Sequence, residues 1–302
     1  MSDPATSESP TLEALVVRIR VAFPQLAFSK AELIGSGEDN LVVVLDDEQI
    51  ARFPRKVEYR GRFAAELNLL SKFSPISPLP VPRYERVSPD RSFGVYERIK
   101  GAEMTVEVFS TMAPADQRIA LASLAAFLSS LHALPAEAIT QPDGSIARTW
   151  SGERFVALYR RVRRAEIAQI ISAPMLARFD SFHDTFKAVA PGPSRLAHND
   201  LTDDHILVQD GRITGIIDFS DAAFGDPAID FAWFWLLGES NVDLVLRDYR
   251  FASDDGSLKE RSHWIFVRYL INQLWYGLQG KSGLTTDQTL AALEPHLKRL
   301  GF

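Results

Sequence analysis

The sequence predicts an α+β protein with two lobes, a small strand-rich lobe followed by a larger, mainly helical lobe. Short apolar runs separated by turns of small residues dominate the chain up to about residue 98, and segments with helical periodicity dominate beyond about residue 115. With 302 residues, of which 46% are hydrophobic, the chain is long enough to bury a large core in two parts.

The elements of the first lobe follow one another closely. The first ten residues are polar, and we expect them to be disordered. Pro54 ends the third strand, because proline cannot donate to a sheet ladder. The predicted elements are a helix over 12–22, a strand, turn and strand over 31–46, a strand over 49–55, a helix over 63–73 and a strand that begins at Phe93.

Helices dominate the second lobe. Four arginines, at positions 160, 161, 163 and 164, are interpreted as one solvated helix face. His132 is interpreted as a structural histidine. Asp226 is placed to cap a helix whose first position is Pro227, where no N–H is needed. Asp226 and Asp230 are both interpreted as structural. The predicted helices span 115–133, 155–171, 175–189 and 227–237.

A β-hairpin is predicted around Asp210-Gly211, because a two-residue type I′ turn needs positive φ at both central positions. In the simplest register Gln209 faces Arg212 and Val208 faces Ile213. His205 then faces Ile216.

This hairpin lies between acidic groups. Asp200 precedes it in His198-Asn199-Asp200, and Asp218 follows it. In the predicted register Asp218 is a diagonal neighbour of His205, on the order of 7 Å away between backbones, so both side chains can reach one ion. Asp200 enters at the same end of the hairpin. The alternative is a surface hairpin preceded by a solvated acidic loop, and the joint spacing of the three groups argues against it.

These motifs resemble the aminoglycoside phosphotransferase family of antibiotic and small-molecule kinases, which are relatives of the protein kinases. The resemblance implies a protein-kinase-like fold, with a nucleotide-binding lobe over 1–98 and a helical lobe over 99–302. It also implies that Asp200 is the catalytic base and that His205 and Asp218 bind Mg²⁺. His205 stands where many members have Asn, and imidazole is the softer ligand. The aminoglycoside 2″-phosphotransferases are most similar, followed by macrolide kinases.

The same resemblance assigns residues to the phosphoryl donor, ATP or GTP. Ser36 and Gly37 lie in the turn that would cover the phosphates. Arg52 matches the phosphate-binding cation, and Glu66 would position it. The remaining donor residues belong to the expected connection between the lobes, where backbone groups would pair with the purine: Tyr96, Glu97 and Ile99.

The acceptor is predicted from its charge. An aminoglycoside carries several ammonium groups, so its site should be acidic, and the acidic residues nearest the catalytic loop are Asp203, Asp221, Glu239 and Asp243. A macrolide carries one amine on a large apolar ring, so its site should be mostly aromatic and aliphatic. The candidates for such a site are Trp233, Trp235, Trp264 and Trp275. The enzyme alternative is therefore a macrolide or small-metabolite kinase. A different class remains open, namely an inactive nucleotide-binding protein with a kinase-like fold.

Composition sets the remaining expectations. The net charge of −6 argues against general nucleic-acid binding and favours a cationic partner. Cysteine is absent, and no apolar run has the length of a membrane span or a signal peptide. We therefore expect a monomeric cytoplasmic enzyme that binds a small molecule and a nucleoside triphosphate.

Overall fold

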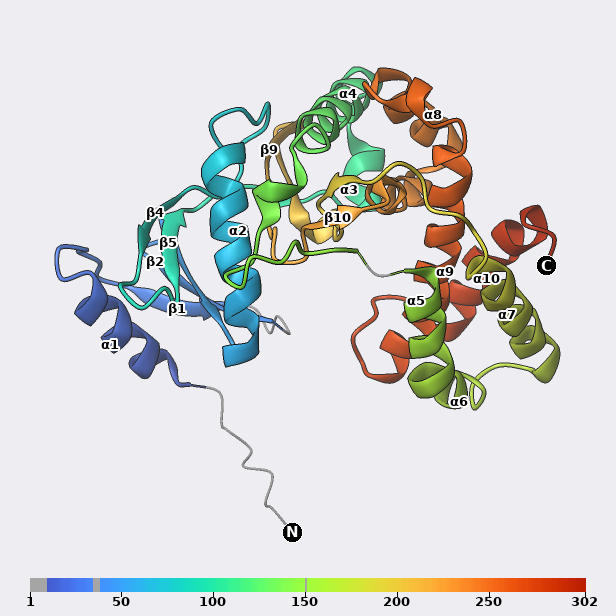
Figure 1. The fold of residues 1–302 in the computed structure, drawn as a ribbon, viewed down its shortest axis with the longest axis horizontal. Coiled ribbons are helices and arrows are strands. Elements are labelled where there is room, and N and C mark those ends of the chain that lie inside the picture. The colour runs from blue at the N-terminus through green and yellow to red at the C-terminus, as the bar shows by residue number, and fades with distance from the viewer. Residues whose placement is uncertain (1–9, 35–38, 150) are drawn as a thin grey trace, which may run out of the picture.

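The protein has two lobes, as the sequence predicts. The computed structural model describes residues 10–34, 39–149 and 151–302. The N-terminal lobe is an antiparallel sheet of five strands in the order β1-β2-β3-β5-β4, and the other lobe is largely helical (Figure 1). The sheet strands are β1 (Ala31–Ile34), β2 (Asn40–Leu45), β3 (Gln49–Pro54), β4 (Tyr84–Val87) and β5 (Gly94–Glu97).

The two faces of the sheet are covered differently because side chains alternate along each strand. Helix α1 (Leu12–Ala22) begins at the cap Thr11 and packs Leu15 and Ile19 against one face. Helix α2 (Arg60–Phe73) lies toward the opposite face, between the sheet and the helical lobe (Figure 1). That second face carries Arg52, which meets α2.

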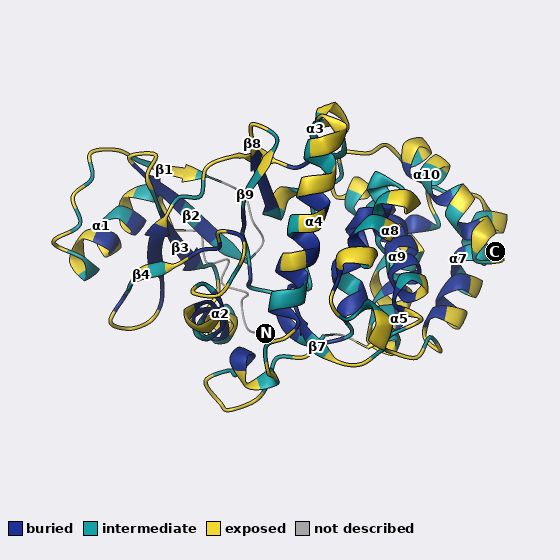
Figure 2. Cartoon of the chain, turned by 90° about the horizontal axis from the view of Figure 1, so that it is seen from above, coloured by how far each residue is buried: buried dark blue, intermediate teal, exposed yellow. Residues whose placement is uncertain are grey.

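The helical lobe has one large core, centred on the buried helix α9 (Leu258–Leu278) and on α4 (Pro114–Leu131). Figure 2 shows buried residues gathered on the inward sides of both helices. The other helices are α3 (Val106–Thr111), α5 (Gly152–Leu158), α6 (Arg164–Ile167), α7 (Ala173–Phe186), α8 (Glu239–Asp248) and α10 (Thr286–Arg299). Short 3₁₀ turns span Val57–Tyr59, Ala136–Ile139, Asp203–His205 and Ala252–Asp254.

Two small sheets lie in the helical lobe. One has the strand order β6-β8-β9, and the other pairs β7 with β10. Their strands are β6 (Ala102–Glu103), β7 (Arg195–Ala197), β8 (Ile206–Gln209), β9 (Arg212–Ile216) and β10 (Ala223–Gly225).

The β8–β9 hairpin confirms the predicted turn and corrects the predicted register. Asp210 and Gly211 have φ of 50° and 73°, as a type I′ turn requires. Near the turn the pairing is as predicted, but a bulge at Thr214 then places Ile206, not His205, opposite Ile216. Gly215, next to this bulge, packs closely against Ile99 and Pro80.

Two predicted helices differ from the structure. The helix predicted over 155–171 is interrupted by a π-helical turn, Tyr159–Arg163, between α5 and α6. The helix predicted over 227–237 is two 3₁₀ segments, Pro227–Phe231 and Trp233–Leu237. Asp226 still caps the first of these, since its side chain accepts from Ala228 N at 3.0 Å.

No helix within the described ranges combines the length and the apolar character needed to cross a membrane.

We predict that Gly215→Ala destabilises the protein. An added Cβ would lie 2.6 Å from Ile99 Cγ2 and 2.8 Å from the Pro80 carbonyl oxygen, so backbone has to move. We expect a loss of about 1–3 kcal/mol in the free energy of unfolding, measured by urea denaturation. Gly256→Ala is the matched control, because nothing lies within 4 Å of its added Cβ. Equal stabilities of the two variants would contradict this packing.

A second prediction concerns acid stability. His183 is buried, donates from Nδ1 to the Phe179 carbonyl at 2.7 Å and stacks on Tyr159. Burial lowers the pKa of His183 to about 4. The unfolded chain, with a histidine pKa near 6.5, therefore binds more protons below that pH, and unfolding becomes easier as pH falls from 6.5 to 4.

We expect His183→Phe, which keeps a ring on Tyr159, to remove about 2 kcal/mol of the stability difference between pH 7 and pH 5. Urea denaturation of both proteins at each pH measures it. The same pH dependence in variant and wild type would show that His183 does not titrate as described.

Candidate active site

The loop that carries Asp200 is held by a buried carboxylate. Asp230 accepts from the backbone N–H groups of His198 and Asn199, each at 2.7 Å. Its partner on the other side is His132 Nε2, at 3.0 Å, and His132 is buried and also bonds Tyr249. The structural reading of His132 is confirmed, and Asp230 is the residue that bonds the backbone of this loop. Asp226 instead bonds Arg261 and Gly192 N.

His198 joins this loop to the segment that carries Asp218. Its Nε2 lies 3.0 Å from the Ile217 carbonyl oxygen and donates to it. Burial lowers the pKa of His198 to about 4, so the ring is neutral near pH 7. Asn199 and Asp218 both have left-handed backbones, with φ of 70° and 59°. Asp218 Oδ2 lies 3.9 Å from His205 Nε2, so the two side chains approach each other although the predicted register is wrong.

Arg52 binds two carboxylates from different elements. Its guanidinium forms ion pairs with Glu66 on α2 and with Asp218 in the helical lobe. Arg52 and Glu66 are only 3% and 1% exposed. Tyr84 also donates to Glu66, at 3.2 Å. The predicted Arg52–Glu66 pair is therefore present, and Arg52 additionally links it to Asp218.

Burial and the neighbouring charges shift the pKa values of Glu66 and Asp218 in opposite directions. Burial raises the pKa of Glu66 to about 7, although Arg52 opposes the shift. Burial would also raise the pKa of Asp218, but Arg52 and His205 outweigh it and lower that pKa. Asp218 is thus an anion at neutral pH, as a metal ligand has to be.

The residues of the predicted metal pair lie together. His205 Nδ1 is 2.8 Å from the backbone oxygen of Asp200 and donates to it, so Nε2 keeps a lone pair in the neutral ring. That Nε2 lies 3.9 Å from Asp218 Oδ2 and 3.7 Å from Asp204 Oδ2. No group of three or more His, Asp or Glu residues in the described chain is arranged to hold a metal. Mg²⁺ prefers oxygen ligands, keeps several waters and binds substrate phosphates, so the Asp218 carboxylate fits it and the His205 imidazole is the softer second group.

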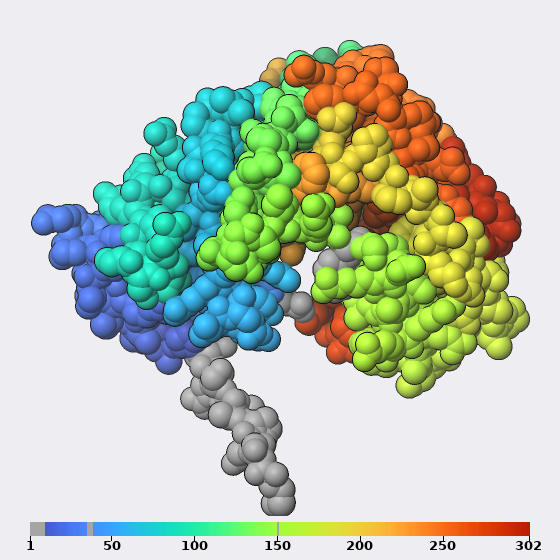
Figure 3. Space-filling view, viewed as in Figure 1, coloured from blue at the N-terminus to red at the C-terminus, as the bar shows by residue number. Residues whose placement is uncertain are grey.

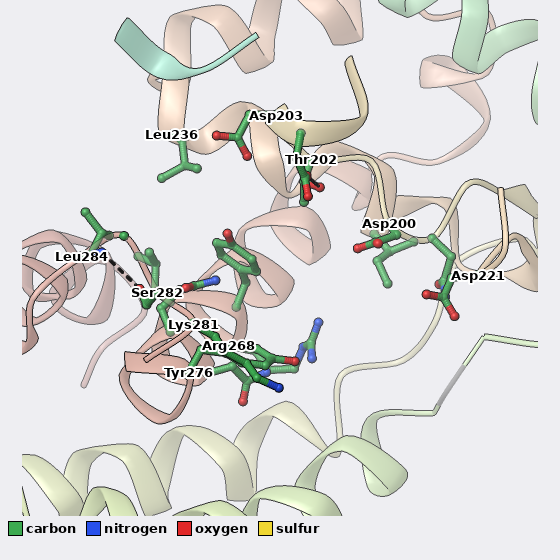
Figure 4. Close-up of a pocket in the computed structure, with 18 of the residues that line it drawn as sticks. Asp200, Thr202, Asp203, Asp221, Leu236, Arg268, Tyr276, Lys281, Ser282 and Leu284 are labelled. Atoms are coloured by element: carbon green, nitrogen blue, oxygen red, sulfur yellow. Dashed lines mark hydrogen bonds between the residues drawn. The ribbon is translucent and has the colours of Figure 1, made fainter. Parts of the chain in front are cut away.

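Asp200 faces a cavity of about 1000 Å³. The molecule is hollowed here between the N-terminal lobe and the segment of α5 and α6 (Figure 3). Enclosure by the walls raises the pKa of Asp200, and the neighbouring carboxylates of Asp221 and Asp204 add to the shift while His205 opposes it. Figure 4 shows Asp200 and Asp221 on one side of the cavity.

The predicted acceptor residues separate into two groups. Asp203 and Asp221 line the cavity with Asp200. Glu239, Asp243 and Trp235 do not, which corrects the prediction. Glu239 pairs with Arg299 and Lys259, and Asp243 pairs with Lys259. Trp235 is buried, donates to Ser262 and stacks on His263.

The residues predicted to bind the nucleotide base lie at the junction of the lobes. Tyr96 is buried on the α2 side of the sheet, in a cluster with Val44 and Ile50. Glu97 is exposed at the end of β5, and Ile99 packs against Gly215. The backbone N–H of Arg98, between them, already donates to the backbone carbonyl oxygen of Glu48 at 2.8 Å, so it is not free to bond a purine. Ser36 and Gly37 lie outside the described residues.

Sequence reasoning missed two cations in the cavity wall, Arg163 and Arg268. The arginine run was interpreted as a solvated face, which holds for Arg161, whereas Arg163 faces the cavity. A signal for Arg268 was present, since it interrupts a long apolar run in α9.

Comparison with known proteins identifies the family of this chain. Residues 30–264 match the model of the phosphotransferase enzyme family. Over 81 residues the chain is 37% identical to the uncharacterized protein YcbJ of Bacillus subtilis (strain 168), a match that covers 26% of each chain.

Two solved structures share the fold across nearly the whole chain. An aminoglycoside 2″-phosphotransferase with GDP and kanamycin superposes with a TM-score of 0.78 at 20% identity, covering 97% of this chain and 100% of the other. A macrolide 2′-phosphotransferase from Brachybacterium faecium superposes with a TM-score of 0.63 at 23% identity, covering 93% of this chain and 98% of the other. The family match, which spans most of the chain, shows that this protein belongs to the phosphotransferase enzyme family.

Proposed function

We propose that the protein transfers the γ-phosphoryl group of ATP or GTP, with Mg²⁺, to a hydroxyl of a small molecule. The observation that carries the proposal is the meeting of three features at one place. A carboxylate, Asp200, faces a cavity large enough for a small molecule. The metal-ligand pair His205 and Asp218 adjoins it, and Arg52 is bonded to that same Asp218.

Each group has a distinct role in this proposal. Asp200 orients the acceptor hydroxyl and accepts its proton at a carboxylate oxygen, and a raised pKa suits a base that works near neutral pH. Arg52, held by Glu66, contacts the donor phosphates. His205 and Asp218 would hold Mg²⁺, which would neutralise charge on the phosphates.

The acceptor is proposed from the acidic side of the cavity. Glu103, Glu107, Asp203 and Asp221 line it together with Asp200, so an acceptor that carries an ammonium group is favoured. Aminoglycosides are such compounds, and a similar structure holds GDP and kanamycin. They are the first acceptors to test. The macrolide alternative is weaker, because Trp235 and Trp264 are buried in the core.

The alternative of an inactive nucleotide-binding protein is disfavoured. Such a protein needs neither Asp200 facing a cavity nor a loop held in a left-handed conformation by Asp230. We propose that the reaction takes place in the cytoplasm, where nucleoside triphosphates are available.

The test is Asp200→Asn. We expect it to lower kcat by about 10²–10⁴ because the base is lost, and to leave nucleotide affinity within about twofold. Transfer is measured by mass spectrometry of a panel of kanamycin-like aminoglycosides, a macrolide and smaller hydroxylated amines. Nucleotide affinity is measured by calorimetry.

Asp210→Asn is the control, since it removes a carboxylate at the hairpin turn, outside the cavity that Asp200 faces, where Asn tolerates the positive φ. If Asp200→Asn retains wild-type turnover, Asp200 is not the base. If the wild type modifies no acceptor in an extended panel, the proposed transfer itself fails.

A further inference from the structure

The cavity has a cationic wall that the reaction does not require. Arg163 and Arg268 line it, and Figure 4 shows Arg268 across the cavity from Asp200 and Asp221. The Nε atoms of both arginines are buried without a hydrogen-bond partner. Neither guanidinium has an ion pair with any residue in 10–34, 39–149 or 151–302.

Nearby arginines behave differently. Arg160 and Arg164 lie on the same helical segment as Arg163, and they form ion pairs with Asp184 and Asp180 of α7. Arg163 is the last residue of the π-helical turn and lines the cavity instead. Both side chains are half-buried and their Nε atoms are fully enclosed. Withdrawing a cation from water without a counter-charge is costly, so the unpaired state of Arg163 and Arg268 favours an anionic ligand.

Aromatic rings hold the two guanidiniums in place. Arg268 lies 3.9 Å from the centre of the Phe155 ring, and Arg163 lies 4.8 Å from that of Trp275. Trp275 is itself fixed, because its Nε1 donates to Glu166 at 3.1 Å. Burial and the charge of Arg163 lower the pKa of Arg268 to about 10, so Arg268 remains a cation at neutral pH.

We infer that the acceptor carries an anionic group, a carboxylate or a phosphate, that binds between Arg163 and Arg268 while its hydroxyl lies at Asp200. The inference rests on the proposed function and narrows its acceptor class. Guanidiniums bind both oxyanions through paired N–H donors. The best acceptor is then a hydroxylated compound with an anionic group at one end. An aminoglycoside offers ammonium groups to the acidic side of the cavity but no anionic group to Arg163 and Arg268, so we expect it to bind more weakly than an acceptor that carries both charges.

The experiment compares acceptors that differ only in the anionic group. Hexuronic acids and hexose phosphates are matched with neutral hexoses, and hydroxylated amino acids are matched with their amides. Each is assayed with saturating Mg²⁺ and ATP or GTP. The variants are Arg163→Gln, Arg268→Gln and Arg268→Lys, the last keeping the charge in case the glutamine variant folds poorly. Arg161→Gln is the control, because it removes the same charge from an exposed position of the same segment.

We expect the anionic member of a pair to have at least a tenfold higher kcat/KM. Arg163→Gln and Arg268→Gln should raise its KM at least tenfold with little change in kcat, because they remove binding common to the ground and transition states. The neutral member should be unaffected, and Arg161→Gln should behave as wild type.

A binding measurement separates this inference from the proposed function. With a non-hydrolysable nucleotide and Mg²⁺ bound, inorganic sulfate and phosphate should raise the Tm of wild type, Arg161→Gln and Asp200→Asn alike. They should raise it less in Arg163→Gln. Loss of transfer with this pattern intact would overturn the reaction and leave the anion site standing. Equal use of anionic and neutral acceptors, or equal stabilisation of Arg163→Gln and Arg161→Gln, would overturn the anion site.

Discussion

The ion pairs of Arg52 are the interaction on which the rest of the site depends. Arg52 on β3 binds Glu66 on α2 and Asp218 in the helical lobe, so one guanidinium fixes a strand, a helix and the second lobe. Because the group is buried, removing one partner would leave uncompensated charge, a change that usually costs several kcal/mol. The sheet therefore cannot shift on the helical lobe without breaking contacts at the site itself.

The hydrogen bonds of Asp230 hold the other side of the site. Asp230 is fully buried and accepts hydrogen bonds from two backbone N–H groups of the loop before Asp200. His132 Nε2 forms a third hydrogen bond with it. His198 then bonds Ile217 and ties that loop to the segment of Asp218. Asp200 and Asp218 are thus positioned through backbone bonds to one framework, which is how a fold keeps catalytic groups in place before a substrate arrives.

Local features of the site could be predicted from sequence, and features set by distant packing could not. The Asp210-Gly211 turn follows from the φ preference of two residues, and it was confirmed. The bulge at Thr214 lies beside the close packing of Gly215 on Ile99 and Pro80, and no local sequence pattern indicates it, so the predicted register was wrong. Periodicity likewise could not show that one arginine of the four, at the end of a π-helical turn, lines the cavity. Nor could it show that Glu239 forms ion pairs with Lys259 of α9 and Arg299 of α10.

The most direct test of this account is the Mg²⁺ dependence of nucleotide binding, measured by calorimetry with a non-hydrolysable ATP or GTP analogue. The account predicts that Mg²⁺ tightens binding to the wild type and to Asp210→Asn, and that Asp218→Asn loses at least about tenfold of this gain, since the carboxylate that Arg52 positions is absent. The same Mg²⁺ dependence in Asp218→Asn and wild type would contradict the assignment of Asp218 and, with it, the role given to Arg52.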